Sequence, residues 1–237
     1  MIDETDLSQE NTWFYEQRAK TVINNLQKKN ISAQYVSDRK EALTTLLEMI
    51  PTGAAVARGD SITVDQIGII PELKKRKQNR LIDPLERDAD GQFVIPELGE
   101  RIKIVRETFS ADIFLVGTNA VTLDGKLVNT DGWGNRVSPM IFGPEKVIVV
   151  AGANKIVKDV NEALERIRVT AAPMNAKRHY LKHHRPEWGD LPCIRTGSCV
   201  DCRHDYRICN YTVIIEGTQI PDKDRINIIL VGEELGI

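Results

Sequence analysis

Three short runs of apolar residues constrain the fold of this chain most strongly. They occupy residues 54–57, 111–117 and 146–151. Uninterrupted apolar runs of this length are typical of strands that are buried on both faces of a parallel sheet. Between them, apolar residues recur at helical spacing, as at Leu98, Ile102 and Val105. This alternation predicts an α/β fold built on an open parallel sheet.

The remaining segments extend this pattern. Apolar spacing predicts helices near 8–29, 37–50, 98–109 and 157–171, and further strands at 31–36, 211–215 and 226–231. Residues 71–95 are charged and irregular, and we assign them no function. Residues 174–210 are rich in His, Arg, Pro, Trp and Cys and lack periodicity, so we expect a functional insertion between sheet strands. We expect one α/β domain over residues 1–237.

Composition excludes several classes of protein. The chain has 32 Lys and Arg against 34 Asp and Glu, and 41% of its residues are hydrophobic, as in ordinary globular proteins. We therefore expect neither a nucleic-acid partner nor a membrane partner. The acidic first residues do not resemble a secretory signal, and the apolar runs are too short to span a bilayer. These features predict a cytoplasmic protein.

All four cysteines of the chain lie in one 17-residue segment, with the spacing Cys-x5-Cys-x2-Cys-x6-Cys. They are Cys193, Cys199, Cys202 and Cys209. Such clustering indicates a shared site, and a reducing compartment makes two structural disulfides the weaker interpretation. An iron–sulfur cluster or a zinc ion is expected, with His204 as a substitute ligand, although free redox-active thiols remain an alternative. His179, His183 and His184 lie on a basic stretch that we expect to be exposed, and we predict none of them as a ligand.

Turns follow the apolar runs at places where ligands bind in open α/β sheets. These turns lie at 58–63, 117–122 and 152–155, and the rule that ligands bind beyond the carboxyl ends of parallel strands predicts that they converge on one pocket. The first turn, which contains Gly59 and Ser61, has free amides for a phosphate or carboxylate, but it is equally consistent with an ordinary capped helix start. The segment after 152 lacks the glycines of a dinucleotide fingerprint, so no NAD or ATP site is expected.

Residues 117–144 form the most specific run of the chain. Within it, residues 119–137 read NAVTLDGKLVNTDGWGNRV, followed by Gly143-Pro144 and, at 152–157, by GANKIV. These pieces resemble the signature of the lactate-utilisation (LUD) domain family, and the resemblance extends over nearly all of residues 10–235. It implies a Rossmann-like open twisted sheet of the ribose-5-phosphate isomerase, glucosamine-6-phosphate deaminase and CoA-transferase type.

The polar residues of these turns suit a small anionic metabolite such as a hydroxy or keto acid. Asp131 and Lys155 are the predicted catalytic residues, and Arg136 is expected to take a carboxylate bidentately. The predicted ligand-binding residues are Gly59, Ser61, Asn119, Thr122, Asn129, Asn135, Arg136 and Asn154. Several of them are also turn formers. Asp124-Gly125 predicts a hairpin with a type I′ turn, and Asp131-Gly132 has the same chemistry.

The sequence leaves three possible functions open. The resemblance implies a component of lactate utilisation that acts with iron–sulfur oxidoreductase subunits in the oxidation of lactate to pyruvate. The alternative is an isomerase or CoA-transferase-like enzyme acting on a sugar phosphate or thioester, with the cysteines as a structural metal site. A metal-sensing or redox-sensing module without turnover is a third possibility.

Overall fold

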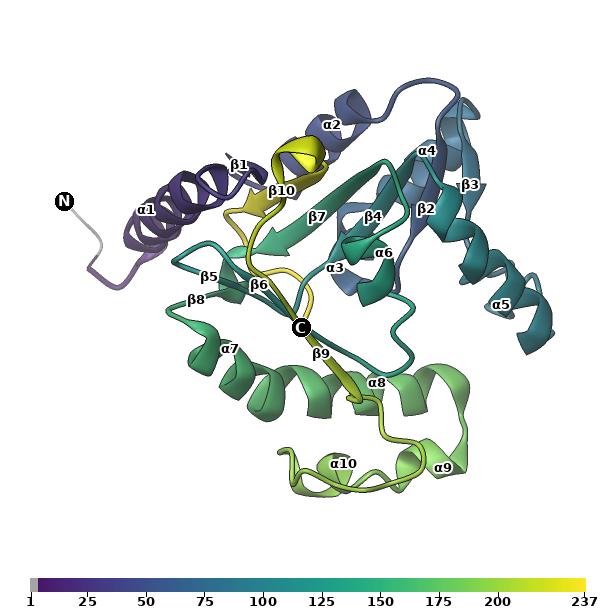
Figure 1. The fold of residues 1–237 in the computed structure, drawn as a ribbon. Helices are drawn as coiled ribbons and strands as arrows, with labels where there is room; N and C mark the ends of the chain where they lie inside the picture. Colours follow the sequence, from purple (N-terminus) through teal and green to yellow (C-terminus); the bar gives the residue numbers. More distant parts are fainter. Residues whose placement is uncertain (1–3) are drawn as a thin grey trace.

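The computed structural model describes residues 4–237, which contain two β-sheets flanked by helices (Figure 1). The main sheet has six strands in the order β1-β10-β7-β4-β2-β3, and all of its neighbouring strands are parallel. Its strands are β1 (Ser32–Val36), β2 (Ala55–Arg58), β3 (Arg80–Ile82), β4 (Ile113–Gly117), β7 (Lys146–Gly152) and β10 (Ile226–Val231). The predicted α/β fold with a parallel sheet is therefore confirmed.

A smaller sheet of four strands has the order β8-β5-β6-β9. Its strands are β5 (Ala120–Thr122), β6 (Leu127–Asp131), β8 (Ile156–Val157) and β9 (Tyr211–Ile215). The expected hairpin joins β5 to β6, but the type I′ prediction is wrong: Gly125 has a φ of 78°, whereas Asp124 is not in the left-handed region. The Thr122 hydroxyl accepts a hydrogen bond from Lys126 N at 2.9 Å and donates one to the Asp124 carboxylate. These two bonds hold the hairpin loop in a conformation other than type I′.

Helices cover both faces of the main sheet. On one face lie α2 (Arg39–Met49), α3 (Ile62–Ile67) and α4 (Ile69–Arg76). On the other lie α1 (Ser8–Gln27), α6 (Val137–Ile141) and the β5–β6 hairpin. Successive side chains of β4 alternate between the two clusters, with Leu115 facing the first and Phe114 and Val116 the second. Burial on both faces explains why this strand is apolar without interruption.

A long helical stretch passes beneath the sheets, drawn in green in Figure 1. It comprises α7 (Val160–Arg166), the π-helical turn η3 (Ile167–Ala171) and α8 (Ala172–His183). The shorter elements of the chain are α5 (Leu98–Glu107), α9 (Pro186–Gly189), α10 (Pro192–Thr196), η1 (Thr108–Ser110), η2 (Ala153–Lys155) and η4 (Ile220–Asp222). None of the helices in residues 4–237 has both the length and the apolar character needed to cross a membrane.

Two segments are more regular than expected. Residues 71–95 contain most of α4 and strand β3, which pairs with β2 at the edge of the main sheet. Residues 174–183 belong to α8 and not to an irregular insertion, and the buried residues of this helix are Pro173 and Ala176. The other side of α8 is polar, so the segment lacks the apolar periodicity that indicates a helix. The irregular part of the predicted insertion begins only after His183.

Candidate functional site

A cavity of about 850 Å³ lies at the carboxyl ends of three parallel strands of the main sheet. Residues 58–63 line it after β2, residues 117–119 after β4, and Lys155 after β7. The three turns that were expected to converge thus contribute to one cavity, in the position that ligands occupy in open α/β sheets. Its other walls come from α5, α8 and residues 205–210. The π-helical turn contributes Ile167 and Ala171.

Lys155 is a buried basic group of this cavity whose pKa is strongly lowered. Its side chain is buried, and its Nζ lies 2.8 Å from the Thr63 hydroxyl oxygen. Burial, together with the charges of Arg166 and Arg136, lowers the pKa of the Lys155 amine from 10.5 to about 7. At neutral pH, a large fraction of this amine is therefore uncharged and available as a base or nucleophile.

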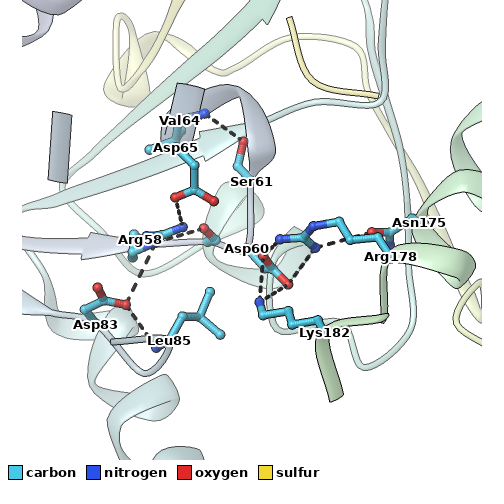
Figure 2. Close-up of polar contacts among 11 residues, drawn as sticks. Arg58, Asp60, Ser61, Val64, Asp65, Asp83, Leu85, Asn175, Arg178 and Lys182 are labelled. Atoms are coloured by element: carbon cyan, nitrogen blue, oxygen red, sulfur yellow. Dashed lines mark hydrogen bonds and ion pairs between the residues drawn. The ribbon is translucent and has the colours of Figure 1, made fainter. Parts of the chain in front are cut away.

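Asp60 is the carboxylate of the cavity that faces the basic side chains of α8. Figure 2 shows its carboxylate between Arg178 and Lys182. Arg178 binds it with both terminal nitrogens, at 2.6 and 3.1 Å, and Lys182 Nζ lies 3.3 Å away. Burial alone would raise the pKa of Asp60, but the hydrogen bond from Arg178 and the charges of Lys182 and Arg178 hold it well below the usual range. This ion cluster ties α8 to the turn after β2.

Arg58 and Ser61 hold the same turn from the other side (Figure 2). The Arg58 guanidinium pairs with Asp65 at 2.5 Å and with the buried Asp83 at 3.9 Å. The Ser61 hydroxyl accepts a hydrogen bond from Val64 N and caps α3. Ser61 therefore has the structural role that the sequence allowed, while its position keeps it on the cavity wall.

The loop 131–136 is organised by its own charged residues. The Asp131 carboxylate accepts hydrogen bonds from the backbone nitrogens of Trp133, Gly134 and Arg136. The Arg136 guanidinium donates to the side-chain oxygens of Asn119 and Asn129 and to the carbonyls of Gly117 and Thr130. Asp131 and Arg136 line the cavity, but their polar atoms are largely engaged in shaping the loops. Lys155 is the predicted catalytic residue with the fewest competing contacts.

The structure separates the predicted ligand-binding residues into two groups. Those that line the cavity are Gly59, Ser61, Asn119, Asn135 and Arg136. Thr122, Asn129 and Asn154 lie outside its lining. Thr122 ends β5 and bonds Lys126 N across the hairpin loop. Asn129 bridges Asn119 N and Arg136, and Asn154 accepts a hydrogen bond from Leu235 N. These three residues hold the loops that carry the site.

A histidine and aromatic cluster forms the outer wall of the cavity. The expectation that His179 and His183 are exposed is wrong: both line the cavity and stack on each other, and Trp188 contacts both rings edge-on. Burial lowers the pKa of His179 and, together with the charges of Lys182 and His179, that of His183 to about 4. Both imidazoles are therefore neutral at physiological pH. His184 is exposed, as predicted.

The cavity carries an excess of positive charge. Among the described residues, seven arginines and lysines line it against three aspartates. Several of the lining residues that matter here were not identified from the sequence. They are Asp60, Arg101, Arg178, His179 and His183. The four-residue separation of Arg178 and Lys182 places both on one helix face, which is the one local signal of a shared partner.

The cysteine segment adjoins this cavity through Cys209, which lines it. All four thiols are free and partly buried. Burial raises the pKa of Cys193 and Cys209, and at Cys209 the nearby Arg207 acts in the opposite direction. Within residues 4–237, however, no three His, Cys, Asp or Glu side chains are arranged to hold a metal ion. A metal at the cysteines would therefore require their side chains to rearrange.

A family model described as "LUD domain" matches residues 19–231. The chain belongs to the LUD domain family. This family is linked to lactate utilisation. The resemblance inferred from the motifs at 119–137 and 152–157 is thus confirmed over most of the chain. Among curated proteins, none matches the sequence.

One of three similar solved structures supports the fold of this LUD-domain protein. A DUF162 family protein from Deinococcus radiodurans has a TM-score of 0.51 at 13% identity, over 92% of this chain and 98% of that one. Ribose 5-phosphate isomerase from Plasmodium falciparum has a TM-score of 0.30 at 12% identity, over 51% of this chain and 52% of that one. The eIF2B delta protein from Chaetomium thermophilum has a TM-score of 0.32 at 13% identity, over 64% of this chain and 54% of that one. The likeness to the DUF162 family protein, at 13% identity, concerns the fold alone.

The turn that carries Lys155 depends on a close approach at Gly152. A Cβ atom there would lie 2.4 Å from Leu235 N and 2.8 Å from the Glu233 carbonyl, so Gly152→Ala must displace backbone. We expect the free energy of unfolding to fall by about 2 kcal/mol or more, as for other overpacked sites. Gly99→Ala is the control, because open space surrounds Gly99 in α5 and alanine favours the helix. Urea unfolding of both variants measures the difference, and equal stability would contradict the close packing at Gly152.

Proposed function

We propose that this LUD-domain protein binds a small organic anion, a hydroxy or keto acid, in the cavity at the strand ends and serves as a component of lactate utilisation. The observation that carries this proposal is the excess of cations around the cavity. Arg178 is neutralised by Asp60 and Arg58 by Asp65 and Asp83, whereas Lys155 and Arg101 have no ion pair within residues 4–237. Uncompensated cations in a cavity favour a negatively charged ligand.

Arg101 supports the proposal from the outer end of the cavity. Its guanidinium lies 3.9 Å from the centre of the Phe93 ring, and that of Arg87 lies 4.0 Å from the same centre. One terminal nitrogen of each arginine is buried and has no hydrogen-bond partner among the described residues. Burial lowers the pKa of Arg101, and the charge of Arg87 adds to this effect. An anion bound at Arg101, which lines the cavity, would satisfy its unpaired donor and offset the repulsion from Arg87.

Calorimetric titration with pyruvate and with lactate tests this assignment. Arg101→Gln is expected to weaken binding about tenfold, because a charge-assisted hydrogen bond contributes roughly 1.5 kcal/mol or more. Arg106→Gln is the matched control, since Arg106 lies on the same helix but is exposed and does not line the cavity. Equal weakening by both variants would indicate a general charge effect, and absence of binding to the unmodified protein would overturn the proposal.

We further propose that the four cysteines bind an iron–sulfur cluster or a zinc ion, and that the protein acts with iron–sulfur oxidoreductase subunits. The clustering of the thiols beside the cavity supports this, because a cluster there would lie close to the bound acid. We expect anaerobically purified protein to contain iron and to absorb in the visible range. Colourless protein with one zinc would leave a structural metal site and exclude electron transfer through it. Protein without metal would contradict both.

A second candidate function is supported by the size of the cavity. About 850 Å³ is more than a three-carbon acid needs, and it is within the range of pockets that hold larger ligands. A sugar phosphate or a thioester would fill it more fully, and an isomerase or CoA-transferase-like activity would then use Lys155 and Asp131. The same titration with a pentose phosphate discriminates the two: tighter binding than that of lactate and pyruvate favours the enzyme.

A further inference from the structure

We propose that the Lys155 amine forms a covalent imine with an anionic aldehyde or ketone, such as a 2-oxo acid, bound in the cavity. This inference rests on the proposed binding of an organic anion and specifies its chemistry. It assigns a carbonyl group to the ligand and a nucleophilic role to one side chain. Four features of the structure support it.

The first feature is the position of the amine. Lys155 closes η2 directly after β7, and its side chain, only 4% exposed, lines the cavity. Its Nζ bonds the Thr63 hydroxyl at 2.8 Å, and within residues 4–237 no carboxylate forms an ion pair with it. Lys182 differs in this respect, because the Asp60 carboxylate holds its ammonium group. An amine without a carboxylate partner is easier to deprotonate.

The second feature is the charge around the amine. Arg136 and Arg166 are the charged groups that act on Lys155, and both disfavour a third positive charge beside them. Together with burial, they bring the pKa of Lys155 to about 7, so the nucleophilic form is well populated at neutral pH. The same two arginines attract an anionic ligand toward the amine.

The third feature is the packing that restricts how the amine is approached. Gly236 has a φ of +71°, and a Cβ atom there would lie 2.8 Å from Lys155 Nζ and 2.4 Å from the Thr63 hydroxyl oxygen. The backbone after β10 therefore covers one side of the amine, and Thr63 lies against it as well. A ligand reaches Nζ from the cavity. This arrangement positions the nucleophile without leaving it in bulk water.

The fourth point is that imine formation needs only the amine and the carbonyl compound and releases only water. The lone pair of Nζ attacks the carbonyl carbon, a carbon–nitrogen bond forms, and the carbonyl electron pair moves to oxygen, which takes a proton. Loss of that oxygen as water leaves the carbon–nitrogen double bond. The Thr63 hydroxyl, in contact with Nζ, is placed to pass a proton between nitrogen and oxygen. Hydrolysis of the imine restores the amine and the carbonyl compound.

Borohydride trapping tests the inference. The protein is incubated with pyruvate, or with dihydroxyacetone phosphate, reduced with sodium borohydride, and examined by intact mass and peptide mapping. We expect a single adduct on Lys155, with a mass gain equal to the carbonyl compound less one oxygen atom. The two compounds distinguish a 2-oxo acid from a phosphorylated ketone, and acetone, which is uncharged, should label at least tenfold less. Labelling with either anion supports the inference.

Two variants provide controls. Lys155→Arg keeps the positive charge but has no amine that forms a stable imine, so labelling should be lost while thermal unfolding shows that the protein is folded. Lys158→Arg, three residues further on and exposed, should label like the unmodified protein. Peptide mapping of the unmodified protein gives the same answer without any variant. An adduct on surface lysines alone, or equal labelling of Lys155→Arg, would overturn the inference.

Calorimetry separates this inference from the function on which it rests. Lactate has no carbonyl group that condenses with an amine, so its binding reports the anion site alone. Binding of lactate and pyruvate without an adduct on Lys155 would overturn the covalent step and leave the anion site intact. Absence of binding of either anion, and of any adduct, would overturn both.

Discussion

Replacing Asp60 by Asn is expected to lower the free energy of unfolding by about 2 to 4 kcal/mol. Removing one partner of a buried ion pair costs about 3–5 kcal/mol, and we reduce this range because the Asp60 side chain is 22% exposed. The cost arises because Arg178 and Lys182, also mostly buried, would face each other without a carboxylate between them. The change keeps the shape of the side chain, so packing contributes little.

The pH dependence of the free energy of unfolding is a second test of the role of Asp60. Because the pKa of Asp60 is lowered in the folded protein, its contribution is present above the ordinary aspartate pKa of about 4 and is lost as the pH falls below that value. The unmodified protein should therefore lose more stability between pH 5 and pH 3 than Asp60→Asn does, since the variant lacks this group. Urea unfolding at each pH measures the difference.

An exposed ion pair provides the control. Glu16 and Lys20 lie one turn apart on α1, 2.7 Å from each other, with 39% of the Glu16 side chain and 56% of the Lys20 side chain exposed. Glu16→Gln should cost no more than about 0.5 kcal/mol, as such pairs do. If Asp60→Asn cost no more than Glu16→Gln, the ion cluster between the turn after β2 and α8 would not stabilise the cavity wall as described.

Replacing Lys155 by Met is expected to change how stability depends on pH by about 5 kcal/mol in total. The pKa of Lys155 is lowered from 10.5 to about 7, and each unit corresponds to about 1.4 kcal/mol. The unfolded chain keeps its proton up to about pH 10.5, while the folded protein loses it near pH 7. The unfolded state thus binds more protons in this interval, so the unmodified protein gains stability as the pH rises from 7 to 10.5.

Lys155→Met has no charge to lose at this position and should lack that gain. We expect the variant to be at least as stable as the unmodified protein at pH 6, and to be the less stable of the two by pH 10. Lys158→Met, at an exposed position in the same segment, should follow the unmodified protein throughout. Parallel pH profiles for Lys155→Met and the unmodified protein would show that the buried amine keeps its proton, which would also remove the basis for imine formation.

Local patterns explain why much of the fold was predictable. The apolar runs at β2, β4 and β7 are strands of the main sheet with both faces buried. An uninterrupted apolar run by itself indicates such a strand, so no distant contact is needed to predict it. The turns after these strands contribute to one cavity because parallel strands end at the same edge. The sequence therefore places Lys155, Gly59 and Ser61 at this edge of the sheet, where the structure has the cavity.

Other parts of the site depend on contacts that no local pattern carries. Asp60 and Arg178 are 118 positions apart, and the spacing of Arg178 and Lys182 on α8 does not say which distant carboxylate they share. The polar side of α8 faces a charged cavity. Its sequence pattern is therefore that of a solvent-exposed helix face, although His179 and His183 are partly buried. Thr122 and Asn154 belong to the family motif, yet both bond backbone atoms of loops outside the cavity lining. A sequence motif can contain residues that hold the loops of a site as well as residues that contact a ligand.

A crystal structure of the protein grown with pyruvate and, separately, with lactate tests the central claim most directly. The account predicts that the anion lies inside the cavity at the ends of β2, β4 and β7, with its carboxylate in contact with cavity cations and the pyruvate carbonyl carbon within reach of Lys155 Nζ. Density for the ligand only on the outer surface, or an empty cavity at concentrations that saturate binding in solution, would contradict it.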